Sequence, residues 1–376
     1  MAKAVYIHIP FCRSICSYCD FCKFYYNKKW VKDYLRALRA EVAAKYKGEE
    51  ITSLYIGGGT PSALDISELK ELFNIISSFK VGPEANFEFT IECNSEDLNV
   101  DKLKLFKKSG VNRLSIGVQT FNESLLEKLN RKLNLDNIKL AFDYFSNISF
   151  DLMYALPGET IEDLKSDVEM AISLNPSHIS VYALIIEPNT ALYISGVEEI
   201  DDSLQRDMYD YVCSTLGNNS ARYNHYEISN FARKGCESQH NLVYWNNEEY
   251  YGFGLGASGY LDGIRYDNTK SINKYSDFWT SSGGGNVSPI ICSEKIDLNR
   301  KLEDEFMLGL RKVPGINKKR FYEKYRFETT DIDLVSLLIE KGELVESETH
   351  VMINPKYIYV SNGIIEKFID TDLLIH

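Results

Sequence analysis

The sequence lacks the long apolar runs and the blocks of basic residues that are typical of proteins acting within membranes or on nucleic acids. No stretch reaches the roughly 18 apolar residues that a membrane-spanning helix needs. The N-terminus, MAKAVYIHIP, has no apolar signal-peptide core and passes directly into a strand-like run. The formal net charge of −12 opposes binding to duplex DNA or to an anionic membrane, because like charges repel. We therefore expect a cytoplasmic protein that spans no membrane and binds no nucleic acid.

The remaining composition is that of a globular protein with a large core. The 376 residues exceed one average domain, and 44% of them are hydrophobic against 26% charged. Eight cysteines in the cytoplasm are expected to remain thiols, so closely spaced cysteines predict a metal site rather than disulfides. The scattered cysteines are expected to be small buried apolar side chains: Cys93, Cys213, Cys236 and Cys292.

The first half of the chain alternates short β-rich runs with helical stretches. This alternation predicts parallel βαβ units, and six such units form a partial version of the eight-fold (β/α) barrel. In barrels of this kind the chemistry lies at the C-terminal ends of the strands. The runs are Ala4–Ile9, Ser53–Gly57, Asn86–Glu92, Arg113–Val118, Ile148–Tyr154 and His178–Ile185, and the helical stretches include Trp30–Lys47 and Ser67–Ser78.

The alternation of strand-like and helical stretches ends at about residue 190, and we predict that the chain forms three segments. Residues 1–190 form the α/β barrel core. Residues 191–286 form an extension rich in Tyr, Asn and Gly, which ends in the loop-like stretch Ser281–Asn286. Residues 287–376 contain helices followed by a hairpin, which predicts a winged-helix-like α+β domain. This last segment has no basic surface, so we expect it to pack or to act as a lid.

Three cysteines, Cys12, Cys16 and Cys19, follow the first run with the spacing C-x3-C-x2-C. A cubane iron–sulfur cluster has four irons and takes four thiolates when it is fully ligated. Three thiolates therefore leave one iron open to a small molecule. The alternative is a zinc knuckle with Cys22 as the fourth ligand, although zinc usually draws its ligands from two separated pairs. We favour the iron–sulfur interpretation, with Cys22 outside the ligand set.

The string YIHIPFCRSICSYCDF (Tyr6–Phe21) resembles the cluster loop of the radical S-adenosylmethionine (radical SAM) superfamily. Its flanks are similar to the branch that contains oxygen-independent coproporphyrinogen III oxidases and HemW-type heme chaperones. The resemblance implies a [4Fe–4S] cluster whose open iron is chelated by the methionine end of SAM. In enzymes of the superfamily, one electron from the cluster cleaves SAM to give a 5′-deoxyadenosyl radical.

The same resemblance implies a SAM site at the strand ends. GGGTP (Gly57–Pro61) follows the second run, where glycines permit close backbone approach and expose N–H groups. Glu92 ends the third run, where a carboxylate can accept hydrogen bonds from ribose hydroxyls. The positions that match SAM contacts in relatives are Tyr6, Tyr18, Gly58, Gly59, Thr60, Glu92, Gln119, Arg131, Asp151 and Ala183.

A second motif, QHNLVYW (Gln239–Trp245), matches the H-N-x-x-Y-W segment of HemW-type heme chaperones. The resemblance implies heme contacts by His240, Asn241, Tyr244 and Trp245. A neutral imidazole can ligate heme iron, and aromatic rings can cover a porphyrin face. The alternative is that these residues pack a loop over the barrel mouth. Many relatives have a histidine after the next GA, where this chain has Ser258, which removes a second heme ligand.

Three functions are compatible with the resemblance. A heme chaperone would bind heme and pass it to a recipient heme protein, such as a membrane cytochrome. A coproporphyrinogen III oxidase would decarboxylate two propionates by radical chemistry. A third option is a radical SAM enzyme with another substrate, such as a methyltransferase.

Three features favour the chaperone. Only three residues precede Ala4, whereas the oxidases usually have a longer N-terminal extension. The oxidases place a further cysteine where this chain has Phe21, one position before Cys22. They also typically lack the H-N-x-x-Y-W segment.

Overall fold

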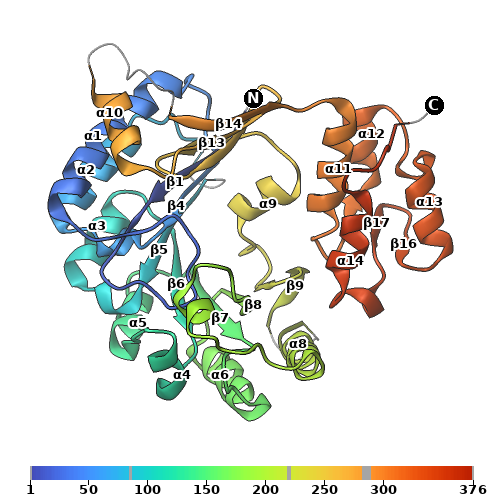
Figure 1. Ribbon diagram of the computed structural model, residues 1–376, viewed down its shortest axis with the longest axis horizontal. Coiled ribbons are helices and arrows are strands. Elements are labelled where there is room, and N and C mark those ends of the chain that lie inside the picture. The colour runs from blue at the N-terminus through green and yellow to red at the C-terminus, as the bar shows by residue number, and fades with distance from the viewer. Residues whose placement is uncertain (1, 84–86, 218–221, 282–288, 375–376) are drawn as a thin grey trace. The chain divides into compact units, whose positions relative to one another are not determined.

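The computed structural model describes residues 2–83, 87–217, 222–281 and 289–374 and divides the chain into two compact units (Figure 1). The barrel unit comprises Met1–Tyr211 and Glu249–Glu294, and the second unit comprises Val212–Glu248 and Lys295–His376. The segment expected to form one extension thus contributes to both units, while the boundaries at residues 190 and 286 stay predictions. The expected linker lies, apart from Ser281, outside the described residues.

Six parallel strands of the barrel unit confirm the predicted α/β fold, a partial (β/α)6 barrel. Each strand pairs in parallel with the next one along the chain. Nearly every residue of these strands is buried, as expected for a parallel sheet covered on both faces. The run expected from Asn86 begins outside the described residues. The strands are β1 (Ala4–Ile9), β4 (Ser53–Gly58), β5 (Glu88–Asn94), β6 (Arg113–Gln119), β7 (Ile148–Tyr154) and β8 (His178–Ala183).

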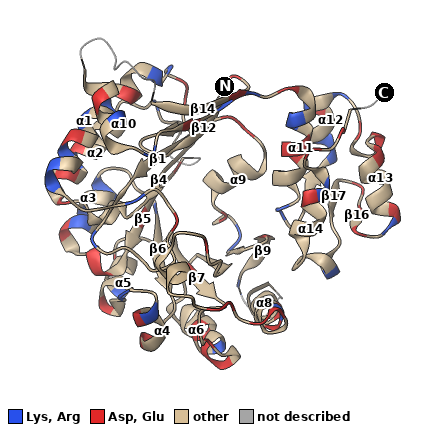
Figure 2. Cartoon of the chain, viewed as in Figure 1, with Lys and Arg blue, Asp and Glu red and all other residues tan. Residues whose placement is uncertain are grey.

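Helices connect these strands and lie along the outer side of the sheet (Figure 1). The first of them begins after Asn27, whose side chain accepts hydrogen bonds from the N–H groups of Lys29 and Trp30. Figure 2 shows that the charged residues of the barrel unit gather on these helices, whereas the strands are mostly uncharged. The helices are α1 (Lys28–Lys45), α2 (Ile66–Ile76), α3 (Val100–Lys108), α4 (Glu123–Lys128), α5 (Leu135–Phe142), α6 (Ile161–Leu174) and α7 (Ala191–Ile194).

The sheet continues on the other side of β1 with a strand from much later in the chain. β11 (Tyr250–Phe253) pairs with β1 in parallel, with Ala4 opposite Tyr250. Two antiparallel strands follow β11, and α10 (Ile272–Thr280) packs on α1. The outer strands are β12 (Ser258–Leu261), β13 (Ile264–Asn268) and β14 (Ile290–Lys295).

A buried carboxylate on α1 forms hydrogen bonds with the segment that contains β11, β13 and α10. Glu41 is fully buried and accepts hydrogen bonds from the N–H of Gly254 at 2.7 Å and from the hydroxyl of Tyr275 at 2.6 Å. The Asn268 amide and the Lys45 ammonium donate to its other oxygen. The buried charge is thereby satisfied by donors from the residue after β11 and from β13, α10 and α1.

The second unit contains helices and a small antiparallel sheet in the order of a winged helix, the order expected for the C-terminal segment. Its antiparallel sheet has the order β15-β17-β16, and its core includes Phe306, Phe321 and Phe368. α8 (Asp202–Gly217) runs from the barrel unit into this unit. The other elements are β9 (Asn224–Glu227), β10 (Asn230–Ala232), α9 (Gln239–Trp245), α11 (Leu298–Gly309), β15 (Ile316–Asn317), α12 (Lys318–Tyr325), α13 (Asp333–Glu340), β16 (Leu344–Glu346), β17 (His350–Ile353) and α14 (Ser361–Ile365).

Among the helices that the structure describes, none is both long enough and apolar enough to cross a membrane.

Candidate cofactor site

The three-cysteine loop is closed at its base directly after β1. The short strands β2 (Phe11–Cys12) and β3 (Phe24–Tyr25) pair in parallel on its two sides. The N–H of Tyr26 donates to the carbonyl of Cys12 at 2.8 Å. The loop therefore leaves from the C-terminal end of a barrel strand, which is the end where barrels place their chemistry.

The predicted cluster ligands lie in different local environments. A Cβ atom on Gly59 would lie 2.9 Å from the Sγ of Cys12, so this thiol rests directly on the glycine-rich turn. Burial raises the pKa of Cys12 to about 11, and burial also raises the pKa of Cys19. Bound iron would have to displace these protons, since thiolates are the ligating form. The guanidinium of Arg131 donates to the Sγ of Cys16 at 3.9 Å.

Within the described part of the chain, no three Cys, His, Asp or Glu side chains converge closely enough to hold a single metal ion. A four-iron cluster takes its thiolates on separate irons, so its ligands need not converge on one point. Three cysteine thiols on one short loop remain a donor set that suits iron–sulfur chemistry.

Cys22 faces a different part of the barrel unit. A Cβ atom on Gly256 would lie 2.8 Å from the Cβ of Cys22, so this side chain packs against the turn between β11 and β12. The carbonyl of Cys22 is bonded by the Nε2 of His8 at 2.8 Å, and the Nδ1 of His8 meets the hydroxyl of Tyr6 at 3.0 Å. Cys22 thus anchors the loop through its backbone. That Cys22 is no cluster ligand stays a prediction.

The glycine-rich turn after β4 lies against the carboxylate of Glu92. The N–H of Gly58 donates to Glu92 at 3.0 Å, and the hydroxyl of Tyr55 donates to its other oxygen at 2.8 Å. A Cβ atom on Gly57 would lie 2.8 Å from the same carboxylate, so only glycine permits this approach. Burial, with a further contribution from the charge of Asp151, raises the pKa of Glu92 to about 7 despite these hydrogen bonds.

Unsatisfied polar atoms mark the end of β6. Gln119 ends this strand at φ 63°, and Arg131 donates to the carbonyl of Gly117 at 2.7 Å. The Oε1 of Gln119 and the Nε of Arg131 are buried and have no hydrogen-bond partner among the described residues. Buried polar atoms in native proteins are normally paired, so these two indicate room for a polar ligand. This observation fits the SAM site that the sequence predicts.

The remaining predicted SAM residues surround this region. Asp151, in β7, accepts a hydrogen bond from Ser115 at 3.0 Å, and burial raises its pKa. Tyr6 stacks on Tyr55 with ring centroids 6.1 Å apart. The other three predicted SAM residues contact or pair with neighbouring side chains and strands. Thr60 accepts from Asn94, Tyr18 packs on the cluster of Leu125, Leu129 and Met153, and Ala183 ends β8 opposite Tyr154.

Sequence reasoning missed the residues that hold the predicted ones in place. Tyr55 and Ser115 bond Glu92 and Asp151 from neighbouring strands, and His8 bonds the cluster loop. The alternation of side chains along a strand was the available signal, because Tyr55 and Gly57 face the same side of β4.

The H-N-x-x-Y-W motif forms α9, in the second unit. His240 is only 1% exposed, and its Nε2 is bonded to the hydroxyl of Tyr244 at 2.7 Å. The two rings meet edge to face with centroids 5.0 Å apart. The N–H of Asn241 donates to the capping hydroxyl of Ser238, and the guanidinium of Arg311 lies 5.6 Å over the ring of Trp245. Heme ligation through the Nε2 of His240 would therefore require the hydroxyl of Tyr244 to move aside.

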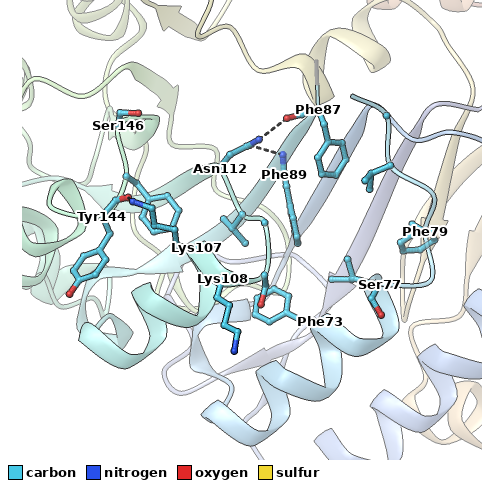
Figure 3. Close-up of a pocket in the computed structure, with 17 residues that line it drawn as sticks. Phe73, Ser77, Phe79, Phe87, Phe89, Lys107, Lys108, Asn112, Tyr144 and Ser146 are labelled. Carbon is cyan, nitrogen blue, oxygen red and sulfur yellow. Dashed lines mark hydrogen bonds between the residues drawn. The ribbon is translucent and has the colours of Figure 1, made fainter. Parts of the chain in front are cut away.

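A cavity of about 830 Å³ opens at the other end of the barrel strands (Figure 3). Phe73, Phe79 and Phe89 line it together with Lys107 and Lys108. It lies where β5, β6 and β7 begin, beside the C-terminal ends of α2 and α3. None of the residues predicted to bind the cluster, SAM or heme lines this cavity.

Glu159, in the loop after β7, gives a testable pH dependence. It is 3% exposed and accepts a hydrogen bond from the N–H of Leu156 at 2.8 Å. Burial raises its pKa from 4.5 to about 8, so between these pH values the folded state holds a proton that the unfolded state releases. Stability should therefore fall as pH rises through this window, by about 1.4 kcal/mol per pH unit at most.

We expect Glu159→Gln to make the fall of stability with pH shallower by the share that Glu159 contributes, while other buried carboxyl groups such as Glu92 keep theirs. Urea unfolding near pH 5 and pH 8 measures it, with Glu162→Gln, at an exposed position of α6, as the matched control. An unchanged slope in Glu159→Gln would contradict the assignment.

Comparison with known proteins agrees with this geometry. A sequence model of the radical SAM superfamily matches residues 6–171. The structure of coproporphyrinogen III oxidase (HemN) from Escherichia coli superposes with a TM-score of 0.82 at 20% identity, covering 98% of this chain and 90% of that one. The barrel and its three-cysteine loop therefore define the class as radical SAM proteins.

Two curated relatives indicate the family within this superfamily to which the chain belongs. The heme chaperone HemW of Bacillus subtilis (strain 168) is 39% identical, over 98% of this chain and 99% of its own length. HemW of Lactococcus lactis subsp. lactis (strain IL1403) is 37% identical, over 99% and 98% of the two chains. The chain belongs to the HemW heme chaperone family. Membership of the radical SAM superfamily implies a [4Fe–4S] cluster and SAM as cofactors.

Proposed function

We propose that this protein is a heme chaperone that binds heme and delivers it to recipient heme proteins, such as a membrane cytochrome. The observation that carries the proposal is the match to HemW heme chaperones along nearly the whole of both chains. Cluster and SAM would then serve a structural or regulatory role in the barrel unit, and the second unit would contact the cargo.

The barrel unit would hold the cluster and SAM with the residues of the candidate cofactor site. Cys12, Cys16 and Cys19 would ligate the cluster, which when bound supplies an electron and an open iron site. The N–H groups of Gly58 and Gly59 are already bonded to Glu92 and Ile9, so the glycine-rich turn would serve the methionine end of SAM by permitting its close approach. The Glu92 carboxylate would accept its ribose hydroxyls, and the unsatisfied atoms of Gln119 and Arg131 would pair with its polar groups. Arg131 would also place a positive charge beside the cluster through Cys16.

In the second unit, α9 would contact heme. His240 would supply an imidazole ligand once its bond to Tyr244 is given up, and Trp245 and Tyr244 would cover part of the ring. Neutral imidazole is the ligating form of histidine.

Hemin titration tests the proposal. We expect wild type to shift the Soret band of hemin, and His240→Ala to bind at least about tenfold more weakly, because one iron–imidazole bond is lost. Tyr244→Phe is the matched variant, because it keeps the ring and removes only the hydroxyl that occupies the Nε2 of His240. It should bind as tightly as wild type or more tightly. Equal binding by His240→Ala and wild type would exclude His240 as a ligand.

The alternative function is coproporphyrinogen III oxidation, which the shared fold with the E. coli oxidase favours. Anaerobic incubation of cluster-loaded protein with SAM, dithionite and coproporphyrinogen III separates the two. Harderoporphyrinogen or protoporphyrinogen among the products would establish the oxidase. No turnover by a preparation that binds hemin would support the chaperone.

A further inference from the structure

A half-buried lysine that forms no ion pair with the described residues lies beside the end of α9. Lys312 follows α11, and its ammonium donates to the side-chain oxygen of Asn246 at 2.6 Å. Among the residues that the structure describes, no acidic group forms an ion pair with it. An ammonium that is partly withdrawn from water is normally paired, because removing a charge from water without a counter-charge is unfavourable.

The charges facing Lys312 are otherwise matched with one another. Arg320 of α12 pairs with Glu248, which follows α9, and Lys324 of α12 pairs with Glu305 of α11. Burial is the main cause that lowers the pKa of Lys312 to about 8. The charges of Arg320 and Lys324 also lower it, and those of Glu305 and Glu248 raise it. From β17, His350 also faces this group, and its own pKa is lowered by burial and by Lys312.

The neighbouring residue adds a second cation next to the motif. Arg311 lies over the ring of Trp245 at 5.6 Å, and its carbonyl accepts a hydrogen bond from the N–H of Ile228, which fixes the turn. Glu227 is the acidic group that faces Arg311, and burial raises the pKa of Glu227 to about 7. Lys312 and Arg311 therefore form a positively charged edge along the C-terminal end of α9, with an aromatic ring beside it.

We propose that Lys312, assisted by Arg311, binds a carboxylate of the cargo, a propionate of heme, next to Trp245. The inference rests on the proposed function. Heme combines a flat apolar ring with two carboxylates at one edge, and α9 with its neighbours offers aromatic rings and an unpaired ammonium. A propionate would supply the counter-charge that Lys312 lacks, in a charge-assisted hydrogen bond.

Porphyrins that differ only in their carboxylates test the proposal. Hemin and hemin dimethyl ester are titrated into wild type, Lys312→Met and Lys319→Met. Lys319 is the matched control, because it lies on α12 with its side chain 86% exposed. We expect Lys312→Met to weaken hemin binding about tenfold and to leave ester binding unchanged, while Lys319→Met binds both like wild type.

Two further readouts separate ligand binding from a structural role. Because Lys312 is half-buried and forms no ion pair in the described part of the chain, Lys312→Met should have a melting temperature at pH 7 equal to or above that of wild type. A lysine needed for packing would lower it. In wild type, hemin affinity should fall as pH rises above about 8, since Lys312 then loses its proton, and Lys312→Met should lack this fall.

The outcomes distinguish the two proposals. If wild type binds hemin but Lys312→Met binds it equally well, or loses hemin and ester equally, the propionate contact is wrong and the chaperone function stands. If wild type binds neither porphyrin, the chaperone function fails and this inference fails with it.

Discussion

Replacing Cys12, Cys16 and Cys19 together by serine is expected to remove essentially all cluster iron from the protein. Serine hydroxyls are poor ligands for iron–sulfur clusters, and these three thiols lie on one loop at the end of β1. The brown colour of the reconstituted protein should disappear. Iron and acid-labile sulfide per chain, measured after anaerobic reconstitution, give the result directly.

Cys22→Ser is the matched control for this loop. Cys22 packs against Gly256 and holds the loop through its carbonyl, and serine preserves that carbonyl. We expect wild-type iron content in this variant. Loss of the cluster in Cys22→Ser alone would show a four-thiolate site and would remove the open iron on which SAM binding depends.

Gly59→Ala is expected to have the second largest effect. The added methyl group would lie 2.9 Å from the Sγ of Cys12 and equally close to the backbone of Pro10 and Phe11, which cannot move away as a flexible side chain can. Overpacking of this kind destabilises by about 1–3 kcal/mol. Cluster content and SAM affinity should fall together, since the cysteine and the turn are displaced at once.

Iron analysis, SAM binding by equilibrium dialysis and urea unfolding measure the three consequences. Gly363→Ala is the control, because its Cβ atom would meet nothing within 4 Å and the position lies in helix α14. It should leave iron content and SAM affinity unchanged. A Gly59→Ala protein with full iron and normal SAM affinity would show that the turn and Cys12 are not packed as described.

Much of the barrel could be predicted because its strands are buried on both faces. A strand of this kind reads as a continuous apolar run, and β1 and β7 have the predicted bounds. α1 begins two residues before its predicted start because Asn27 caps it, a local signal that outweighs the apolar pattern. The winged-helix order was also readable, since its helices and hairpin follow one another along the chain.

The pairing of β11 with β1 could not be predicted from local pattern. β11 has four residues, and its Tyr- and Gly-rich sequence resembles a loop as much as a strand. Its place is decided by distant contacts, above all the hydrogen bond from Gly254 to the buried Glu41. Sequence reasoning had no means to connect these two segments.

The residue types of the candidate site can be read from the sequence but their geometry cannot, and the roles of these residues stay predictions. Glu92 lies at the glycine-rich turn, as a strand-end carboxylate should, but the rise of its pKa to about 7 depends on burial, which sequence does not show. The burial of His240 and its bond to Tyr244 were likewise invisible, since a histidine in a motif looks the same whether it is free or partnered. Lys312 went unnoticed because a single lysine in a loop is normally solvated.

The position of β1 between β4 and β11 has a consequence for biogenesis. The strand that leads into the cluster loop keeps one unpaired edge until the ribosome has made Phe253. Unpaired edges associate with other chains, and contacts so distant in sequence form slowly. Gly256, against which Cys22 rests, is also made only then. Iron–sulfur assembly factors should therefore meet a fully supported acceptor loop only late in synthesis, after Gly256 has been made.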